Sequence, residues 1–425
     1  MGANSSSLEF TTEPKLPSGG SLEHCCAVEH PPTIPAEIAP SSSHTNAKFR
    51  HLNFFILFLT VIKSVLDSEN TKSSSDFGNF VLEKDVFGCL PTNLNFNMRK
   101  PRIAVIFTGG TIAMKLDVGF GGIVPALSAT EILDSVPGIR ELADITAVEF
   151  GRFPGPHVTP DIMLQLSRTC AELAASPDID GIIVTHGTDT LEETAFFLDC
   201  TTNTEKPIIV IGAMRNSSEL DWDGPRNLRD AILVASHEGF RGMGVLVCLS
   251  GNINAASEVS KTDTAELSTF ASFDFGPIAR ITNQKITIYR RPHHREFFDV
   301  QRLPSFVPLL KCYTGMDGDL VRVCLERGAA GIVIEAFGVG NVTPPIYYAL
   351  TEAIAKNIPV VLVSRCPVGR IEHVYAYEGA GKHLYDAGVI FADYLNGQKA
   401  RIKLMVAIGA GYSNEQIRGS FEWAE

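Results

Sequence analysis

Two short, uninterrupted apolar runs, residues 103–107 and 181–184, constrain this fold most. Runs of this kind predict strands that are buried on both faces, as in a parallel sheet. Each run leads directly into small, hydroxyl-bearing residues: Thr108-Gly109-Gly110-Thr111 after the first and Thr185-His186-Gly187-Thr188-Asp189 after the second. Because ligands of open α/β sheets bind at the carboxyl ends of the strands, we expect both segments at one ligand-facing edge.

Strands alternate with helices beyond the first run. Apolar runs predict further strands at 208–211, 245–249, 331–335 and 360–364. Helical spacing predicts helices at 160–175, 191–199, 227–236 and 346–356. The predicted fold is therefore α/β, with a larger N-terminal domain built on a doubly wound parallel sheet and a smaller C-terminal α/β domain.

The composition divides the chain into four parts. Residues 1–97 are rich in Ser, Pro, Asn and Thr and predict a disordered or poorly structured extension. This part contains an apolar patch at 52–66, too short for a typical spanning helix but compatible with an internal signal-anchor, and a myristoylation pattern at Met1-Gly2. We expect the first domain at 98–289, beginning at Met98, a linker at 290–308, and the second domain at 309–425.

Charge and cysteine content narrow the class of protein. The formal net charge of −12 has no basic patch, so nucleic acid is not an expected partner. Nine scattered cysteines indicate reduced core residues and therefore a cytoplasmic protein, and membrane association is not expected. Neither a Cys-x-x-Cys nor a His-Glu-x-x-His spacing occurs, so no metal site is predicted, and His293-His294 is interpreted as part of a solvated loop.

The residues after the two runs can be given chemical or structural roles. The Gly109-Gly110 pair would let the backbone approach a ligand and hold the Thr111 hydroxyl on a constrained loop. A threonine hydroxyl needs a base to act as a nucleophile, and Lys261 beside a carboxylate such as Asp189 is a candidate. Taken alone, however, a Gly-Gly-Thr turn also fits a helix N-cap, and His186 fits a hydrogen-bonded residue at a strand end.

The order of the motifs adds a more specific indication. From about residue 102 to 410 the chain strongly resembles the bacterial-type L-asparaginase and glutaminase-asparaginase family. The resemblance implies that Thr111 is the nucleophile and that Thr188, Asp189 and Lys261 form the second catalytic cluster. The implied reaction is hydrolysis of L-asparagine to L-aspartate and ammonia through an acyl-enzyme ester, without a cofactor. Glutamine is an alternative substrate.

Substrate-binding positions follow from the same resemblance. Backbone N–H groups near Thr188 and Ala213 are candidates for an oxyanion hole, and Asp189 for binding the α-ammonium group. The chain departs from the family in two places. Gly155 stands where a serine binds the α-carboxylate, leaving Arg152 or His157 to replace it, and the lid stretch 115–123 has Phe120 but no tyrosine.

The family assembles as oligomers whose sites include residues of a neighbouring subunit. The resemblance therefore implies a homotetramer or homodimer in which Asn341 reaches the partner's site, together with either Glu372 or Glu378. Two other functions share these motifs. One is the amide-hydrolysing subunit of a tRNA-dependent amidotransferase, and the other is an inactive amino-acid-sensing homologue.

Overall fold

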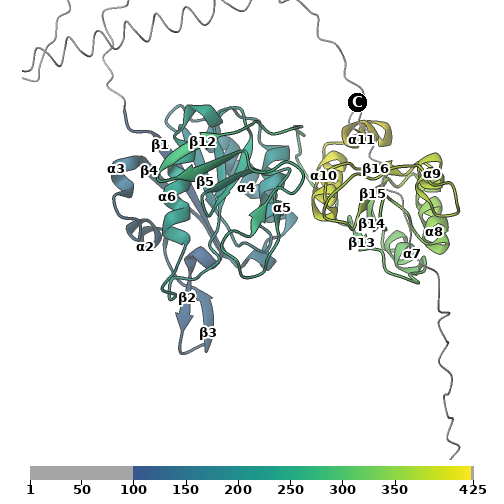
Figure 1. Cartoon of the computed structure of the whole chain (residues 1–425), viewed down its shortest axis with the longest axis horizontal. Helices are drawn as coiled ribbons and strands as arrows, with labels where there is room; N and C mark the ends of the chain where they lie inside the picture. Colours follow the sequence, from purple (N-terminus) through teal and green to yellow (C-terminus); the bar gives the residue numbers. More distant parts are fainter. Residues whose placement is uncertain (1–98, 423–425) are drawn as a thin grey trace, which may run out of the picture. The chain divides into compact units, whose positions relative to one another are not determined.

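An eight-stranded sheet organises the first domain (Figure 1). The computed structural model describes residues 99–422, so the predictions for residues 1–97 and the start at Met98 lie outside the described residues. The sheet has the order β12-β11-β8-β7-β6-β5-β1-β4. Its strands are β1 (Arg102–Gly109), β4 (Asp144–Phe153), β5 (Gly181–Thr185), β6 (Ile208–Ile211), β7 (Val245–Leu249), β8 (Asn252–Ala255), β11 (Ala279–Thr282) and β12 (Lys285–Ile288).

The sheet is parallel where the apolar runs predicted it and antiparallel at one edge. Strands β4, β1, β5, β6 and β7 are parallel neighbours. Strands β8, β11 and β12 are antiparallel to their neighbours, which the alternation of strands and helices did not predict. Two of these pairings have a local cause. The two-residue turns Ser250-Gly251, between β7 and β8, and Asn283-Gln284, between β11 and β12, have positive φ at both residues, the conformation that reverses a hairpin.

Helices cover both faces of this sheet, as predicted. Alternate residues of β1 enter different cores: Ile103 and Val105 pack with α6, and Ala104 and Ile106 with α4 and α5. The helices of the domain are α2 (Ala129–Asp134), α3 (Ile139–Leu142), α4 (Pro160–Ala175), α5 (Leu191–Thr201) and α6 (Gly224–Ala235), with short 3₁₀ turns η1 (Thr111–Ala113), η2 (Gly155–His157) and η3 (Glu238–Phe240).

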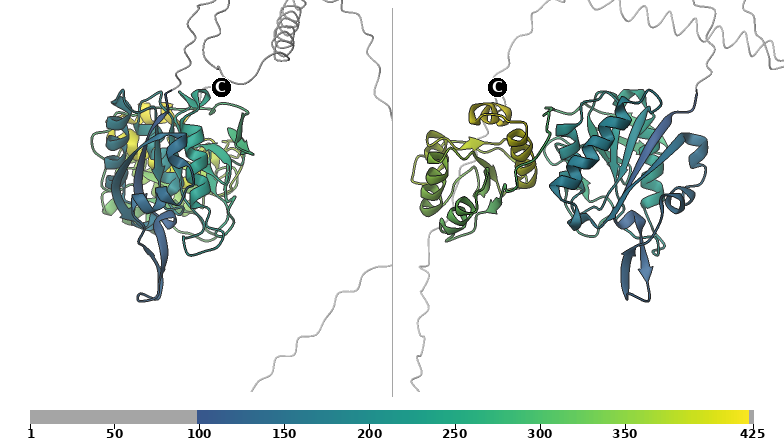
Figure 2. Two further views of the ribbon diagram at one scale, coloured as in Figure 1. Left: turned by 90° about the vertical axis from the view of Figure 1, so that its left-hand side faces the viewer. Right: turned by 180° about the vertical axis from the view of Figure 1, so that it is seen from behind.

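Two small strand pairs lie outside the main sheet. The hairpin of β2 (Met114–Asp117) and β3 (Gly122–Pro125) extends beyond the rest of the first domain in both views of Figure 2. Leu116, Val118, Phe120 and Ile123 are exposed on it, and the hairpin includes residues 115–123, the stretch compared above with the lid of the family. The second pair joins β9 (Ser260–Lys261) to β10 (Phe270–Ala271).

A four-stranded parallel sheet forms the second domain, which has the predicted α/β class. Its order is β13-β14-β15-β16, and its helices build two cores, one of which includes α4 and α5 side chains of the first domain. The strands are β13 (Leu309–Lys311), β14 (Ile332–Ala336), β15 (Val360–Ser364) and β16 (Ile390–Phe391). The helices are α7 (Asp319–Glu326), α8 (Pro344–Ala355), α9 (Gly381–Asp386), α10 (Gly397–Gly409) and α11 (Asn414–Phe421).

Several other features bear on the sequence predictions. The structure assigns no helix or strand to residues 289–308, which include His293-His294. The six cysteines of the described part are free thiols, five of them buried, and burial raises the pKa of Cys170 to about 12. Among residues 99–422, no helix combines the length and the apolar character needed to cross a membrane.

Candidate active site

The loops after β1, β4 and β5 meet in backbone contact at the carboxyl edge of the sheet. A Cβ built on Gly110 would lie 2.4 Å from the backbone nitrogen of Gly187. A Cβ on Gly187 would in turn lie 2.7 Å from the Cα of Gly155. Only glycine allows such close approach, so these residues bring the two sequence motifs and the 153–155 loop to one place. We call the contacting glycines Gly110, Gly155 and Gly187 the glycine floor.

Thr188, Asp189 and Lys261 form a hydrogen-bonded cluster beside the glycine floor. The Lys261 ammonium donates to the Thr188 hydroxyl at 3.1 Å and forms an ion pair with Asp189 Oδ1 at 2.9 Å. Thr188 is buried, whereas the Asp189 side chain is 60% exposed. The cluster thus presents one ammonium that orients a buried hydroxyl, and one carboxylate that a ligand can reach.

Thr111 begins the short turn η1 directly after β1. Its neighbour Gly110 has φ 80° and ψ −179°, a conformation open essentially to glycine alone. The backbone N–H of Gly110 donates to the Phe153 carbonyl at 3.0 Å, which anchors the turn to the end of β4. Gly110 contacts Gly187 of the loop that carries Thr188. Thr111, the residue that follows Gly110, is therefore close to that loop.

His186 has a structural role in this loop. Its Nδ1 lies 2.9 Å from the Gly187 carbonyl and its Nε2 3.0 Å from the Thr194 hydroxyl. A carbonyl can only accept, so Nδ1 carries the proton and Nε2 accepts from Thr194. Burial lowers the pKa of His186 to about 4, which keeps the ring neutral. Both ring nitrogens therefore hold the loop in shape, in agreement with the strand-end interpretation.

The remaining first-domain candidates border the same cluster. A Cβ on Gly155 would lie 3.4 Å from the Cβ of Asp189, and the Gly155 carbonyl accepts a hydrogen bond from Thr190 at 2.8 Å. Ala213 is fully buried after β6, and a Cβ on the preceding residue, Gly212, would lie 2.9 Å from Cγ2 of Thr188. Both positions are therefore next to the Thr188-Asp189 segment.

Asn341, Glu372 and Glu378 lie in the second domain. The Asn341 side-chain oxygen accepts a hydrogen bond from the backbone N–H of Gly381 at 3.3 Å. Across residues 99–422, no side-chain hydrogen bond joins these three residues to Thr188, Asp189 or Lys261. A Cβ on Gly381 would lie 2.5 Å from the Glu372 carbonyl, so Glu372 is near Asn341, while the Glu378 carboxylate accepts from the hydroxyl of Tyr348 on α8.

Glu192 is a residue beside the site that the sequence reasoning missed. It is 6% exposed in the first turn of α5, and its Oε2 accepts the backbone N–H of Lys261 at 2.8 Å. Its other oxygen accepts from Gln398 on α10. Because glutamates are common in the first turn of a helix, no sequence signal indicated that this one is buried with specific partners.

The described residues offer no cluster suited to a metal. Across 99–422, no group of three or more His, Cys, Asp or Glu side chains could hold a metal ion.

Comparisons with known proteins identify the family of the chain. Residues 102–294 match the family described as Asparaginase, N-terminal, and residues 306–421 match the Glutaminase/Asparaginase C-terminal domain. A probable L-asparaginase of Deinococcus radiodurans is 39% identical over 325 residues, which cover 76% of this chain and 97% of that protein. An L-asparaginase of Bacillus licheniformis is 32% identical over 320 residues, 75% of this chain and 98% of that protein.

A solved structure extends the likeness to the fold. The crystal structure of a probable cytoplasmic L-asparaginase from Campylobacter jejuni is 33% identical and aligns with a TM-score of 0.70, covering 76% of this chain and 99% of that one. Sequence and fold therefore agree over nearly the full length of these relatives. The chain belongs to the bacterial-type asparaginase family of amidohydrolases.

Proposed function

We propose that this chain hydrolyses the side-chain amide of L-asparagine to L-aspartate and ammonia, with Thr111 as the nucleophile. The observation that carries the proposal is the Lys261 ammonium in contact with both Thr188 and Asp189, beside the loop that holds Thr111. Relatives whose names identify them as L-asparaginases support asparagine as the substrate. Glutamine, one methylene longer, is expected to be a poorer substrate.

The first step forms an ester. The Thr111 oxygen attacks the amide carbon, and the tetrahedral oxyanion is stabilised by backbone N–H groups near Thr188 and Ala213. As the C–N bond breaks, the leaving nitrogen takes up the proton that the Thr111 hydroxyl gives up, and ammonia departs. The acyl group remains on Thr111 as an aspartyl ester.

The second step regenerates the enzyme. A water molecule adds to the ester, its proton passes to the Thr111 oxygen, and L-aspartate leaves. The Thr188-Lys261-Asp189 cluster is suited to moving protons at this edge because its groups lie within hydrogen-bonding distance of one another. The exposed Asp189 carboxylate is also free to meet the substrate's α-ammonium group through Oδ2.

We further propose that the active form is a homo-oligomer with composite sites. In that assembly Asn341 and one of Glu372 and Glu378 would reach the substrate in a neighbouring subunit. The position of Asn341 in the second domain, bonded to Gly381 and not to the Lys261 cluster, supports a role outside its own subunit's site.

We infer a cytoplasmic location for the enzyme. The Campylobacter jejuni protein, named as probably cytoplasmic, has the same fold, and the six described cysteines are free thiols. Both observations fit a reducing compartment.

Ammonia release from asparagine by the purified full chain tests the function. We expect Thr111→Ala and Thr188→Ala each to reduce kcat by about 10³-fold or more, with unchanged unfolding transitions. Thr169→Ala is a matched control, because the Thr169 hydroxyl donates to the Gln165 carbonyl of its own helix, α4. An inactive wild-type chain that still binds asparagine would instead identify an amino-acid sensor.

A further inference from the structure

Lys261 has little support from the main sheet. The loops with Thr111 and Thr188 follow β1 and β5, long neighbouring strands of the eight-stranded sheet. Lys261 instead lies on β9, a strand of two residues that pairs only with the equally short β10. Since a two-residue strand fixes its side chains weakly, the position of the Lys261 ammonium depends on other contacts.

The N-cap and first turn of α10, from the second domain, supply such contacts directly to Val259 and Ser260, and to Lys261 through Glu192. The Lys399 ammonium donates to the carbonyl of Val259. Asn396, the N-cap of α10, donates through its side chain to the Ser260 hydroxyl at 2.9 Å. The backbone N–H of Lys261 is held by Glu192, and this carboxylate is held in turn by Gln398.

Lys399 is an unusual residue for this position. It is 1% exposed, and burial lowers its pKa to about 8, although carboxylates of Glu192, Glu258 and Asp199 offset part of that effect. Burying an ammonium is costly, and an apolar residue would often be equally stable there. What an apolar residue could not provide is a donor for the Val259 carbonyl.

We propose that the first turn of α10, through Lys399, Gln398 and Asn396, is a positioning element that holds Lys261 against Thr188 and Asp189. This inference rests on the proposed function, because it assigns the turn's effect to catalysis by Lys261. The second domain would then contribute to the site of its own subunit through the backbone of residues 259–261, without itself touching the substrate.

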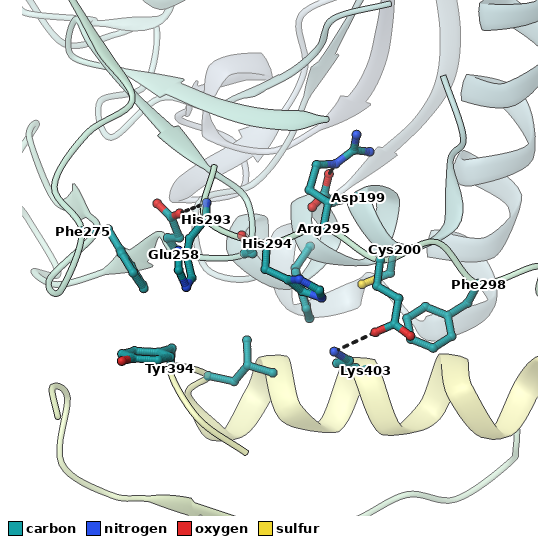
Figure 3. Close-up of a pocket in the computed structure, with 14 residues that line it drawn as sticks. Asp199, Cys200, Glu258, Phe275, His293, His294, Arg295, Phe298, Tyr394 and Lys403 are labelled. Carbon is teal, nitrogen blue, oxygen red and sulfur yellow. Dashed lines mark hydrogen bonds and ion pairs between the residues drawn. The ribbon is translucent and has the colours of Figure 1, made fainter. Parts of the chain in front are cut away.

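The chain offers a matched control four residues along the same helix. Lys403 (Figure 3) is also buried. Its ammonium, however, pairs with Glu296 at 3.0 Å and donates to the Ser420 carbonyl. Lys399→Met and Lys403→Met therefore each remove one buried ammonium from α10. Only the first removes a contact to the segment that carries Lys261.

Steady-state kinetics of the full chain on asparagine test the proposal, together with inhibition by L-aspartate and thermal unfolding. We expect Lys399→Met to lower kcat about 10- to 100-fold, with KM and aspartate inhibition within about threefold of wild type. Lys403→Met should keep kcat within about threefold, whatever its effect on the unfolding midpoint. A general structural role would instead move kcat, KM and stability together in both variants.

A second variant covers the case in which Lys399→Met does not fold. Gln398 is only partly buried, so Gln398→Ala should fold, and we expect it to lower kcat at least fivefold with little change in KM. Near wild-type kcat in Gln398→Ala and in any folded Lys399→Met would overturn the proposal. Absence of activity in the wild-type chain would refute the asparaginase function instead, so the two failures are distinguishable.

Discussion

A methyl group on the Cα of Gly110 would come within 2.4 Å of the backbone nitrogen of Gly187, two residues that lie 77 positions apart in the chain. No flexible side chain is available there to move aside, because the neighbouring atoms are all main chain. The contact therefore fixes the distance between the loop of Thr111 and the loop of Thr188.

We expect Gly110→Ala to reduce both activity and stability. The φ of 80° strains any other residue, and separation of the two loops by even about 1 Å is expected to lower kcat on the order of 100-fold. Ammonia release and urea unfolding measure the two effects. Gly328→Ala is the control, since Gly328 has φ 76° but nothing within 4 Å of its added Cβ. Equal behaviour of the two variants would show that backbone strain alone, and not the contact, decides the outcome.

Gly155→Ser should strengthen asparagine binding. A Cβ at this position would be 3.4 Å from the Asp189 Cβ, so the residue fits with small adjustments. A hydroxyl bonded to the α-carboxylate is worth about 1 to 3 kcal/mol, which predicts a KM roughly 5- to 150-fold lower.

The effect of the hydroxyl can be separated from that of added volume. Gly155→Ala adds the Cβ alone and should leave KM nearly unchanged. With 3-aminopropanamide, which lacks the α-carboxylate, Gly155→Ser should bring no gain. If wild-type KM for asparagine is already micromolar, another group such as Arg152 or His157 makes this contact, and the serine would add nothing.

Acid should destabilise the chain through His186. Its folded pKa of about 4 lies below the ordinary value of 6.5, so between these pH values the unfolded chain binds more protons than the folded one. Stability therefore falls as pH drops from 6.5 toward 4, and the share of this one group is about 2 kcal/mol between pH 7.5 and pH 5. Urea unfolding at the two pH values measures this effect. The free energy of unfolding should fall less between pH 7.5 and pH 5 in His186→Asn than in wild type.

If each site is built from two subunits, two variants that are each inactive should regain activity when they are mixed. Thr111→Ala would inactivate the first-domain half of a site, and Asn341→Ala the second-domain half. In a mixed oligomer, one site combines both intact halves, so mixing after dissociation and reassembly should recover activity that neither variant has. The same mixing with Glu372→Ala and Glu378→Ala identifies which glutamate belongs to the composite site. Failure of every mixture, with mixed oligomers demonstrated, would place each site within one subunit.

The sequence predicted those parts of the fold that depend on local patterns. Helix α4 and strands β6, β7 and β15 have the predicted limits, because short apolar runs and a Pro at a helix start are local signals. The antiparallel edge was not predicted, since neither Ser250-Gly251 nor Asn283-Gln284 is the Asn-Gly or Asp-Gly pair most typical of a two-residue hairpin turn.

The candidate site was predicted unevenly for a similar reason. Thr111, Thr188, Asp189 and Lys261 came from ordered motifs, which a single sequence displays. The contact of Lys399 with Val259 joins residues 140 positions apart, and nothing near either residue indicates the other. Such a contact depends on how the two domains pack, which no local sequence pattern indicates.

The glycine floor also limits which substitutions this candidate site can accept. At Gly110 and Gly187 an added Cβ would meet backbone atoms at 2.4 and 2.7 Å, so neither position can accept a side chain without moving a loop. Gly155 is the member of the floor where a side chain fits, and it faces Asp189. Among these three glycines, substitutions that preserve the fold are therefore restricted to the position beside Asp189. A change of amino-acid preference in descendants of this chain would have to begin there or in side chains that enter from outside the floor.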